Sequence, residues 1–364
     1  MSAHGPMPRS AWIFPALSVL FFAGATALGV TFTPSAAGLA FAAALLVILF
    51  GTVFAAVHHA EVIAERIGEP YGTLLLTLAV TVIEVALIAT IMLGDKPVPT
   101  LARDTVFAVV MIVCNGLVGI CILAGGLRYR EQDVQVTGSN LYLSVLIVMA
   151  TITLIMPNYT LTTPGPVYSA AQLGFVSVVT LLLYGVFLYT QTIRHRNYFV
   201  GEAAVADGGG QTSNRMLGLS ILLLLVSLLA VVLLAKKFSL VVDFATARIG
   251  APPAFAGVLV ALLILLPESV AAIAAARNND LQKSINLALG SSVATIGLTI
   301  PAVAVAAYAL DMPLVLGLNA QETVLLILTF VLSMLTFATG RTNILFGLVH
   351  VVVFAVFVFL VFVP

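Results

Sequence analysis

Long apolar runs separated by short polar segments make up most of the chain. Eleven runs are continuously apolar, and a helix needs about 20 such residues to cross the hydrocarbon core of a membrane. Transmembrane β-strands would instead alternate polar and apolar residues. The pattern predicts an all-α polytopic membrane protein with about eleven transmembrane helices, at residues 12–32, 35–57, 71–93, 105–126, 140–156, 169–190, 216–235, 253–276, 284–308, 322–338 and 343–362.

Part of the first half is repeated in the second half. Arg66-Ile67-Gly68-Glu69-Pro70 has a twin in Arg248-Ile249-Gly250-Ala251-Pro252, and Glu84 and Glu268 follow these arginines by 18 and 20 residues. Glu84 falls in the third predicted span and Glu268 in the eighth. Because this offset of five spans is odd, the two copies cross the membrane in opposite directions. We therefore predict an inverted five-plus-five repeat with one extra N-terminal helix, a common build of secondary transporters.

The repeat divides the chain into four parts. Residues 1–34 hold the extra N-terminal helix, 35–190 the first repeat of five helices and 216–364 the second repeat. Residues 191–215 form the longest polar segment and include a run of three glycines, so we expect a flexible cytoplasmic linker.

Composition and charge indicate membrane lipid, and not nucleic acid, as the molecule that the chain contacts. Hydrophobic residues make up 61% of the chain and charged residues 8%, which indicates membrane lipid as the surroundings. The 15 basic and 15 acidic residues cancel, so there is no electrostatic basis for binding nucleic acid. Ten basic residues fall on the N-terminal side of the spans and five on the other side. The positive-inside rule then predicts a cytoplasmic N-terminus and a C-terminus outside.

Two carboxylates in the predicted spans are the main candidates for chemistry. Glu84 and Glu268 are the acids that fall in mid-span, where a charge costs at least about 2.5 kcal/mol on insertion scales. Two facing carboxylates can hold either protons or a cation, which is the minimum chemistry of an antiporter. The alternative is a pair of protonated glutamates that bond across helices. Pro267 predicts a helix that is kinked or broken beside Glu268.

Neutral oxygen donors accompany both glutamates. Hard cations such as sodium or calcium take ligands of this kind. Alternatively, hydroxyl groups in membrane helices bond only their own backbone. The candidate supporting ligands are Thr81, Asn115, Asn286, Ser291, Ser292 and Thr295, and Asn115 aligns with Thr295 in the repeat.

Two further polar residues have more than one reading. His350 in the last span could relay protons, although bonding to a neighbouring helix is the more common role of such a residue. Glu69 is expected at a helix start, where the dipole favours a carboxylate, or at an ion entrance.

At these residues the chain resembles the calcium/cation antiporter superfamily, specifically its bacterial cation/proton exchangers of the Cha type. The resemblance implies eleven helices in the inverted arrangement, an inner-membrane location, and exchange of sodium, potassium or calcium for protons. It also implies that Glu84 and Glu268 are the paired ion-binding glutamates, with no cofactor besides the transported cation. It is carried by Gly68-Glu69-Pro70-Tyr71-Gly72, Pro267-Glu268, Gly290-Ser291-Ser292 and Gly340-Arg341-Thr342-Asn343.

We therefore expect a proton-coupled cation antiporter and no enzymatic activity. A passive cation channel is the nearest alternative, and the inverted repeat with one acid per half favours the carrier. An intramembrane enzyme would need a nucleophile with its base or an acid-rich metal motif, and the sequence contains neither a His-Glu-x-x-His string nor a clustered aspartate pair.

The charge bias yields a test of orientation. A reporter fused after Pro364 should be active outside the cytoplasm, and one inserted at Gly209 should be active inside it. Reporter activity on the two sides of the membrane is the measurement, and the opposite pattern at both positions would invert the predicted topology.

Overall fold

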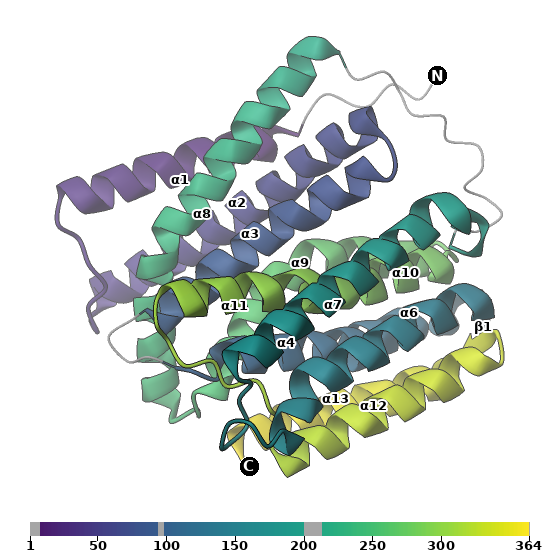
Figure 1. Cartoon of the computed structure of the whole chain (residues 1–364). Coiled ribbons are helices and arrows are strands. Elements are labelled where there is room, and N and C mark those ends of the chain that lie inside the picture. Colours follow the sequence, from purple (N-terminus) through teal and green to yellow (C-terminus); the bar gives the residue numbers. More distant parts are fainter. Residues whose placement is uncertain (1–7, 94–97, 200–212, 364) are drawn as a thin grey trace. The chain divides into compact units, whose positions relative to one another are not determined.

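The computed structural model describes residues 8–93, 98–199 and 213–363. Within these residues, eleven helices are long and apolar enough to cross a membrane, which confirms the predicted fold class. Figure 1 shows the course of these helices, and the described residues also form two short strands. The glycine run of the predicted linker lies outside the described residues.

The first six spans contain three simple helices and three interrupted ones. Their elements are α1 (Arg9–Ala27), α2 (Ala36–Ile67), α3 (Tyr71–Met92), α4 (Leu101–Met111), the π-helical turn η1 (Ile112–Leu117), α5 (Val118–Tyr129), α6 (Val136–Ala150), η2 (Thr151–Ile155), η3 (Met156–Tyr159), α7 (Ala170–Tyr189) and η4 (Thr190–Arg194). The short turn η5 (Arg196–Tyr198) follows them.

The last five spans contain one interrupted helix. Their elements are α8 (Asn214–Ile249), α9 (Ala254–Arg277), α10 (Leu281–Ala294), the π-helical turn η7 (Thr295–Thr299), α11 (Ile300–Ala309), α12 (Ala320–Ala338) and α13 (Ile344–Phe362). Strands β1 (Glu131–Asp133) and β2 (Arg341–Asn343) pair antiparallel, with Gln132 opposite Thr342.

The described helices form two compact units. The first contains α1, α2, α3 and α8, and the second contains α4 to α7 with α9 to α13. Each unit thus combines helices from both halves of the sequence.

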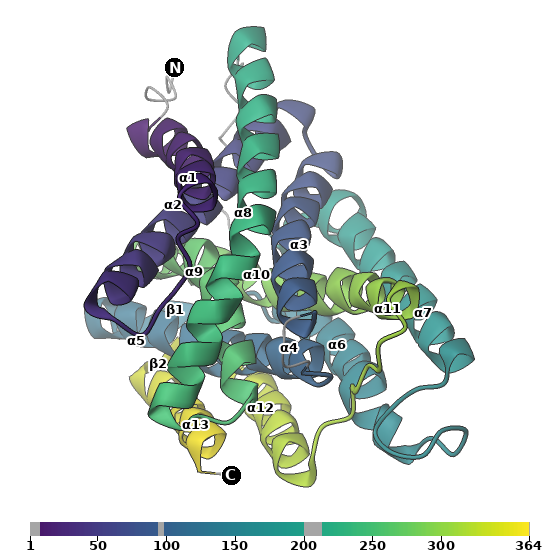
Figure 2. The ribbon, with the colours of Figure 1, turned by 90° about the vertical axis from the view of Figure 1, so that its left-hand side faces the viewer.

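In the first unit, α2, α3 and α8 pack against one another, and α1 lies on α2 and α8 (Figure 2). Leu45, Leu49 and Leu234 are completely buried there. At Gly51 of α2 a side chain would meet the Phe14 ring at 2.1 Å, so the approach of α1 to α2 depends on glycine.

The repeated Arg-Ile-Gly string ends a helix in both copies. Helices α2 and α8 end one residue before Gly68 and Gly250, whose φ angles are 77° and 66°. Glycine adopts this backbone conformation without steric cost, which explains its place at helix C-termini. Pro70 and Pro253 then precede the first turns of α3 and α9. The duplicated motif is therefore a helix end followed by a helix start.

Two helices extend well beyond the predicted spans. The sequence predicted ends at residues 57 and 235, whereas α2 continues to Ile67 and α8 to Ile249. Hydropathy reports only the part in hydrocarbon, and charged residues can continue a helix into water. In this extension of α2, His59 is buried and its Nε2 lies 2.9 Å from the Ala11 carbonyl oxygen.

In the second unit the fourth span is the most enclosed. Helix α9 packs along α4, and a side chain at Gly257 would meet the backbone of Asp104 at 2.8 Å. Helices α5 and α13 also approach closely, because a Cβ atom at Gly119 would lie 3.0 Å from the Gly347 carbonyl oxygen. Small residues at both crossings let the backbones approach one another.

The expected break at Pro267 is absent. Helix α9 runs without interruption through this residue, so of the two predicted outcomes, a kinked or a broken helix, the break was wrong. Proline removes one backbone donor, and a membrane helix tolerates this when neighbouring helices cover the site; Pro267 itself is buried. The regular hydrogen bonding changes instead at the π-helical turns η1 and η7.

Candidate functional site

Glu84 lies on α3 in the first unit. Its exposed fraction is 1%, and α3 carries no other charged residue. Thr81 precedes it by three residues, close to one helical turn, and is also buried. Glu84 and Thr81, both candidates from the sequence, therefore lie in the enclosed part of this helix.

A row of threonines leads along α3 toward Glu84. Thr73 Oγ1 donates to the Glu69 carboxylate at 2.7 Å, Thr77 Oγ1 to the Thr73 carbonyl oxygen at 2.8 Å, and Thr81 Oγ1 to the Thr77 carbonyl oxygen at 2.9 Å. The hydroxyl protons of Thr77 and Thr81 thus bond the helix backbone, as the alternative interpretation predicted. Each oxygen keeps lone pairs that can accept a bond or coordinate a cation. Thr73 was not among the candidates from the sequence. Its spacing of four residues from Thr77 places it in the same row.

Glu268 lies on α9 in the second unit and is partly buried. The residue before it, Pro267, has no backbone N–H, so it gives no helical hydrogen bond to the carbonyl oxygen of Leu263 four residues earlier. A proline beside the acid therefore alters the backbone bonding of the helix while the helix continues.

The helix next to α9 supplies neutral oxygen atoms. Helix α10 packs along α9 and carries Ser291 and Ser292. Ser292 is completely buried, and its Oγ has no hydrogen-bond partner among the described residues. Thr295 begins η7, just as Asn115 lies in η1, so both of these predicted ligands lie in π-helical turns. The Ser292 oxygen therefore has lone pairs that no described residue uses.

Asn115 belongs to a buried hydrogen-bond network in the second unit. Its Nδ2 donates to Thr329 Oγ1 at 2.8 Å, and its Oδ1 lies 3.2 Å from His350 Nδ1. His350 Nε2 lies 2.9 Å from Thr336 Oγ1. All four side chains are completely buried. This network ties η1 to α12 and α13, and His350 bonds neighbouring helices, as the more common role predicted.

Asn286 also uses both ends of its amide. Its Nδ2 donates to the Phe199 carbonyl oxygen, and its Oδ1 accepts from Gln282 Nε2 at 2.8 Å. It thereby attaches α10 to the segment that follows η5. The structure thus places Asn115 and Asn286 in contacts between chain segments.

Within the part of the chain that the structure describes, no three histidine, cysteine, aspartate or glutamate side chains gather to hold a metal ion. Cys114 and Cys121 are buried free thiols. Carboxylate, hydroxyl and carbonyl oxygens are the ligands that a hard cation takes.

The Asn115 network gives a prediction on stability. Asn115→Leu leaves Thr329 and His350 each without one partner, and a buried unsatisfied polar group costs about 1–3 kcal/mol. We expect a lower midpoint of thermal unfolding in detergent. Asn140→Leu, at an exposed position of α6, is the control and should change little. Equal midpoints for the two variants would contradict a stabilising role for the network.

Sequence comparison finds both a family and close relatives. The sodium/calcium exchanger protein family matches residues 36–193 and 219–363. The putative ionic transporter y4hA of Sinorhizobium fredii (strain NBRC 101917 / NGR234) is 43% identical, covering 100% of this chain and 98% of the relative. The sodium-potassium/proton antiporter ChaA of Escherichia coli (strain K12) is 37% identical, covering 87% of each.

Solved structures share the fold at low sequence identity. Native YfkE superposes with a TM-score of 0.74 at 16% identity, covering 97% of this chain and 100% of that one. The H+/Ca2+ exchanger CAX has a TM-score of 0.67 at 14% identity, covering 96% of this chain and 88% of that one. These matches support the architecture of the spans.

Proposed function

The chain belongs to the sodium/calcium exchanger protein family, and we propose that it exchanges sodium or potassium for protons across the bacterial inner membrane by alternating access. It is an integral membrane protein and a secondary active cation antiporter. The choice of monovalent cations follows the Escherichia coli relative, whose name specifies sodium, potassium and protons. Calcium is the further candidate, because structural neighbours are calcium/proton antiporters.

The observation that carries the proposal is a glutamate within one apolar helix of each repeat. Glu84 is almost completely buried on α3, and Glu268 is partly buried on α9. In a low dielectric the charged carboxylate is disfavoured unless a proton or a cation neutralises it. If both occupants use the same oxygens, binding of one displaces the other. That exclusion is what couples the two fluxes.

Hydroxyl oxygens accompany each glutamate in this proposal. In the second unit, Ser292 has a buried oxygen that accepts no bond from the described residues, and Ser291 and Thr295 lie on the same span. In the first unit, Thr81 lies three residues before Glu84 on α3. In this proposal, Asn115 and Asn286 connect chain segments through hydrogen bonds. The oxygen and the nitrogen of each side-chain amide already have partners.

The threonine row gives the first repeat a polar surface toward its glutamate. Glu69 stands at its exposed end, and Thr73, Thr77 and Thr81 follow at four-residue intervals. At about 1.5 Å per residue, the row from Glu69 to Glu84 spans about 22 Å. We infer that a partly dehydrated cation approaches Glu84 along these oxygens.

The test removes the titratable charge from each glutamate. Glu84→Gln and Glu268→Gln keep size and hydrogen bonding, and each should reduce coupled exchange to the background of empty vesicles. Dissipation of an imposed pH gradient in everted vesicles is measured on adding sodium, potassium or calcium separately. Glu131→Gln, which removes a charge from an exposed strand, is the control and should exchange normally.

Proton competition supplies a second measurement on the wild-type chain. The cation concentration for half-maximal exchange should fall as pH rises, because fewer protons then occupy the carboxylates. A pair of protonated structural glutamates predicts that both glutamine variants stay active, since an amide mimics a protonated acid. Normal exchange in both variants, with normal insertion, would contradict the proposed site.

A further inference from the structure

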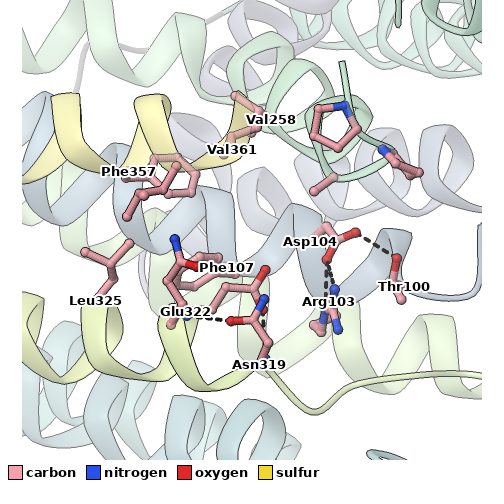
Figure 3. A pocket seen from close by; sticks show the side chains of 15 residues that line it. Thr100, Arg103, Asp104, Phe107, Val258, Asn319, Glu322, Leu325, Phe357 and Val361 are labelled. Atoms are coloured by element: carbon pink, nitrogen blue, oxygen red, sulfur yellow. Dashed lines mark hydrogen bonds and ion pairs between the residues drawn. The ribbon is translucent and has the colours of Figure 1, made fainter. Parts of the chain in front are cut away.

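A cavity of about 260 Å³ lies in the second unit, apart from the helix segment that carries Glu268. It is bordered by the N-terminal ends of α4, α9 and α12 and by the C-terminal end of α13 (Figure 3). Four helix ends therefore surround a space that the cation-binding proposal does not use.

The walls of the cavity change from polar to apolar along the helices. Arg103, Asp104 and Glu322 lie in the first turns of α4 and α12, whereas Phe107 and Leu325 lie one turn further in. The span that starts with α4 has 29 residues, about 43 Å, which exceeds the hydrocarbon thickness of about 30 Å. The apolar run of this span starts at residue 105, so its first turn falls at the interface and the next turn within the hydrocarbon. The cavity therefore has a polar end at the interface and an apolar end toward the hydrocarbon, which matches the headgroup and acyl chain of a membrane lipid.

Asp104 is neutralised within the polar end. Its Oδ1 accepts from Arg103 Nε at 2.8 Å and lies 2.7 Å from the second guanidinium nitrogen Nη2, and its Oδ2 accepts from Thr100 Oγ1 at 2.8 Å. Arg103 Nη1 donates to the Gly317 carbonyl oxygen at 3.1 Å. These contacts use three of the five guanidinium N–H donors. Arg103 thus has donors left for an anion such as a phosphate group.

Glu322 supplies the remaining charge. Its Oε2 accepts from the Asn319 backbone N–H at 2.9 Å, and its own N–H donates to Asn319 Oδ1 at 2.8 Å, which caps α12. Arg103 and Asp104 cancel, so the polar end carries the negative charge of Glu322. A group that donates hydrogen bonds and carries positive charge complements this carboxylate.

The geometry points to a binding site for one phospholipid with a primary ammonium headgroup, drawn from the surrounding bilayer. The phosphate lies at Arg103, the ammonium donates to Glu322, and an acyl chain follows Phe107 and Phe357 toward the hydrocarbon. A choline headgroup has no N–H to donate, and a glycerol headgroup brings no positive charge to Glu322. The site should therefore distinguish lipids by headgroup.

The experiment is native mass spectrometry of the full chain in detergent with three lipids of identical acyl chains. Phosphatidylethanolamine should bind about tenfold more tightly than phosphatidylcholine or phosphatidylglycerol, the worth of one charge-assisted hydrogen bond. Glu322→Gln removes the charge but keeps the helix cap, since glutamine also serves at this position. This variant should lose the preference. Asp311→Asn, an exposed acid outside the cavity, should keep it.

A second variant tests the apolar half. Val361→Trp fills space along the wall formed by α13 and should weaken binding of all three lipids. Equal binding of the three lipids by the wild-type chain, or an unchanged preference in Glu322→Gln, would overturn the proposal. Tighter binding of phosphatidylglycerol would indicate an anion site at Arg103 and overturn it as well. Each readout is lipid binding, so failure here leaves the transport proposal unaffected.

Discussion

Backbone hydrogen bonding in hydrocarbon constrains every span of this protein. No water is available there, so each N–H and C=O group must find a partner within the protein. Other helices cover the irregular backbone of η1, in which every residue is buried, and Pro267 is buried within α9. The polar side chain of Asn115 uses this covered position to reach α12 and α13. Cover from neighbouring helices is thus what lets polar chemistry exist inside an apolar bundle.

The two repeats share their glutamates but differ in the surfaces beside them. Positions 184 residues after Thr73, Thr77 and Thr81 hold Gly257, Ala261 and Leu265. The threonines give α3 a row of oxygens, whereas Gly257 lets α9 approach the α4 backbone closely. Both helices thus carry an acid, while α3 bears a row of polar side chains and α9 has a glycine that allows close packing.

Sequence patterns predicted the spans and the candidate acids, because hydrophobic length and the cost of a buried carboxylate are local properties. They did not predict the partners of Asn115, since Thr329 and His350 lie 214 and 235 residues away. Periodicity assigns a residue to a helix and says nothing about which distant helix packs beside it. For the same reason Asn286 was predicted as a ligand, and its contact with the Phe199 carbonyl oxygen was not foreseen.

The length of α8 has a mechanical consequence. Its 36 residues form one uninterrupted helix of about 54 Å, without an internal proline or π-helical turn. A rod of this length that tilts by about 10° about its centre moves each end by about 5 Å, in opposite directions. Because the helix has no proline or π-helical turn at which to bend, it moves as a rigid body. A small tilt at one membrane surface therefore displaces the other end of the helix by the same distance.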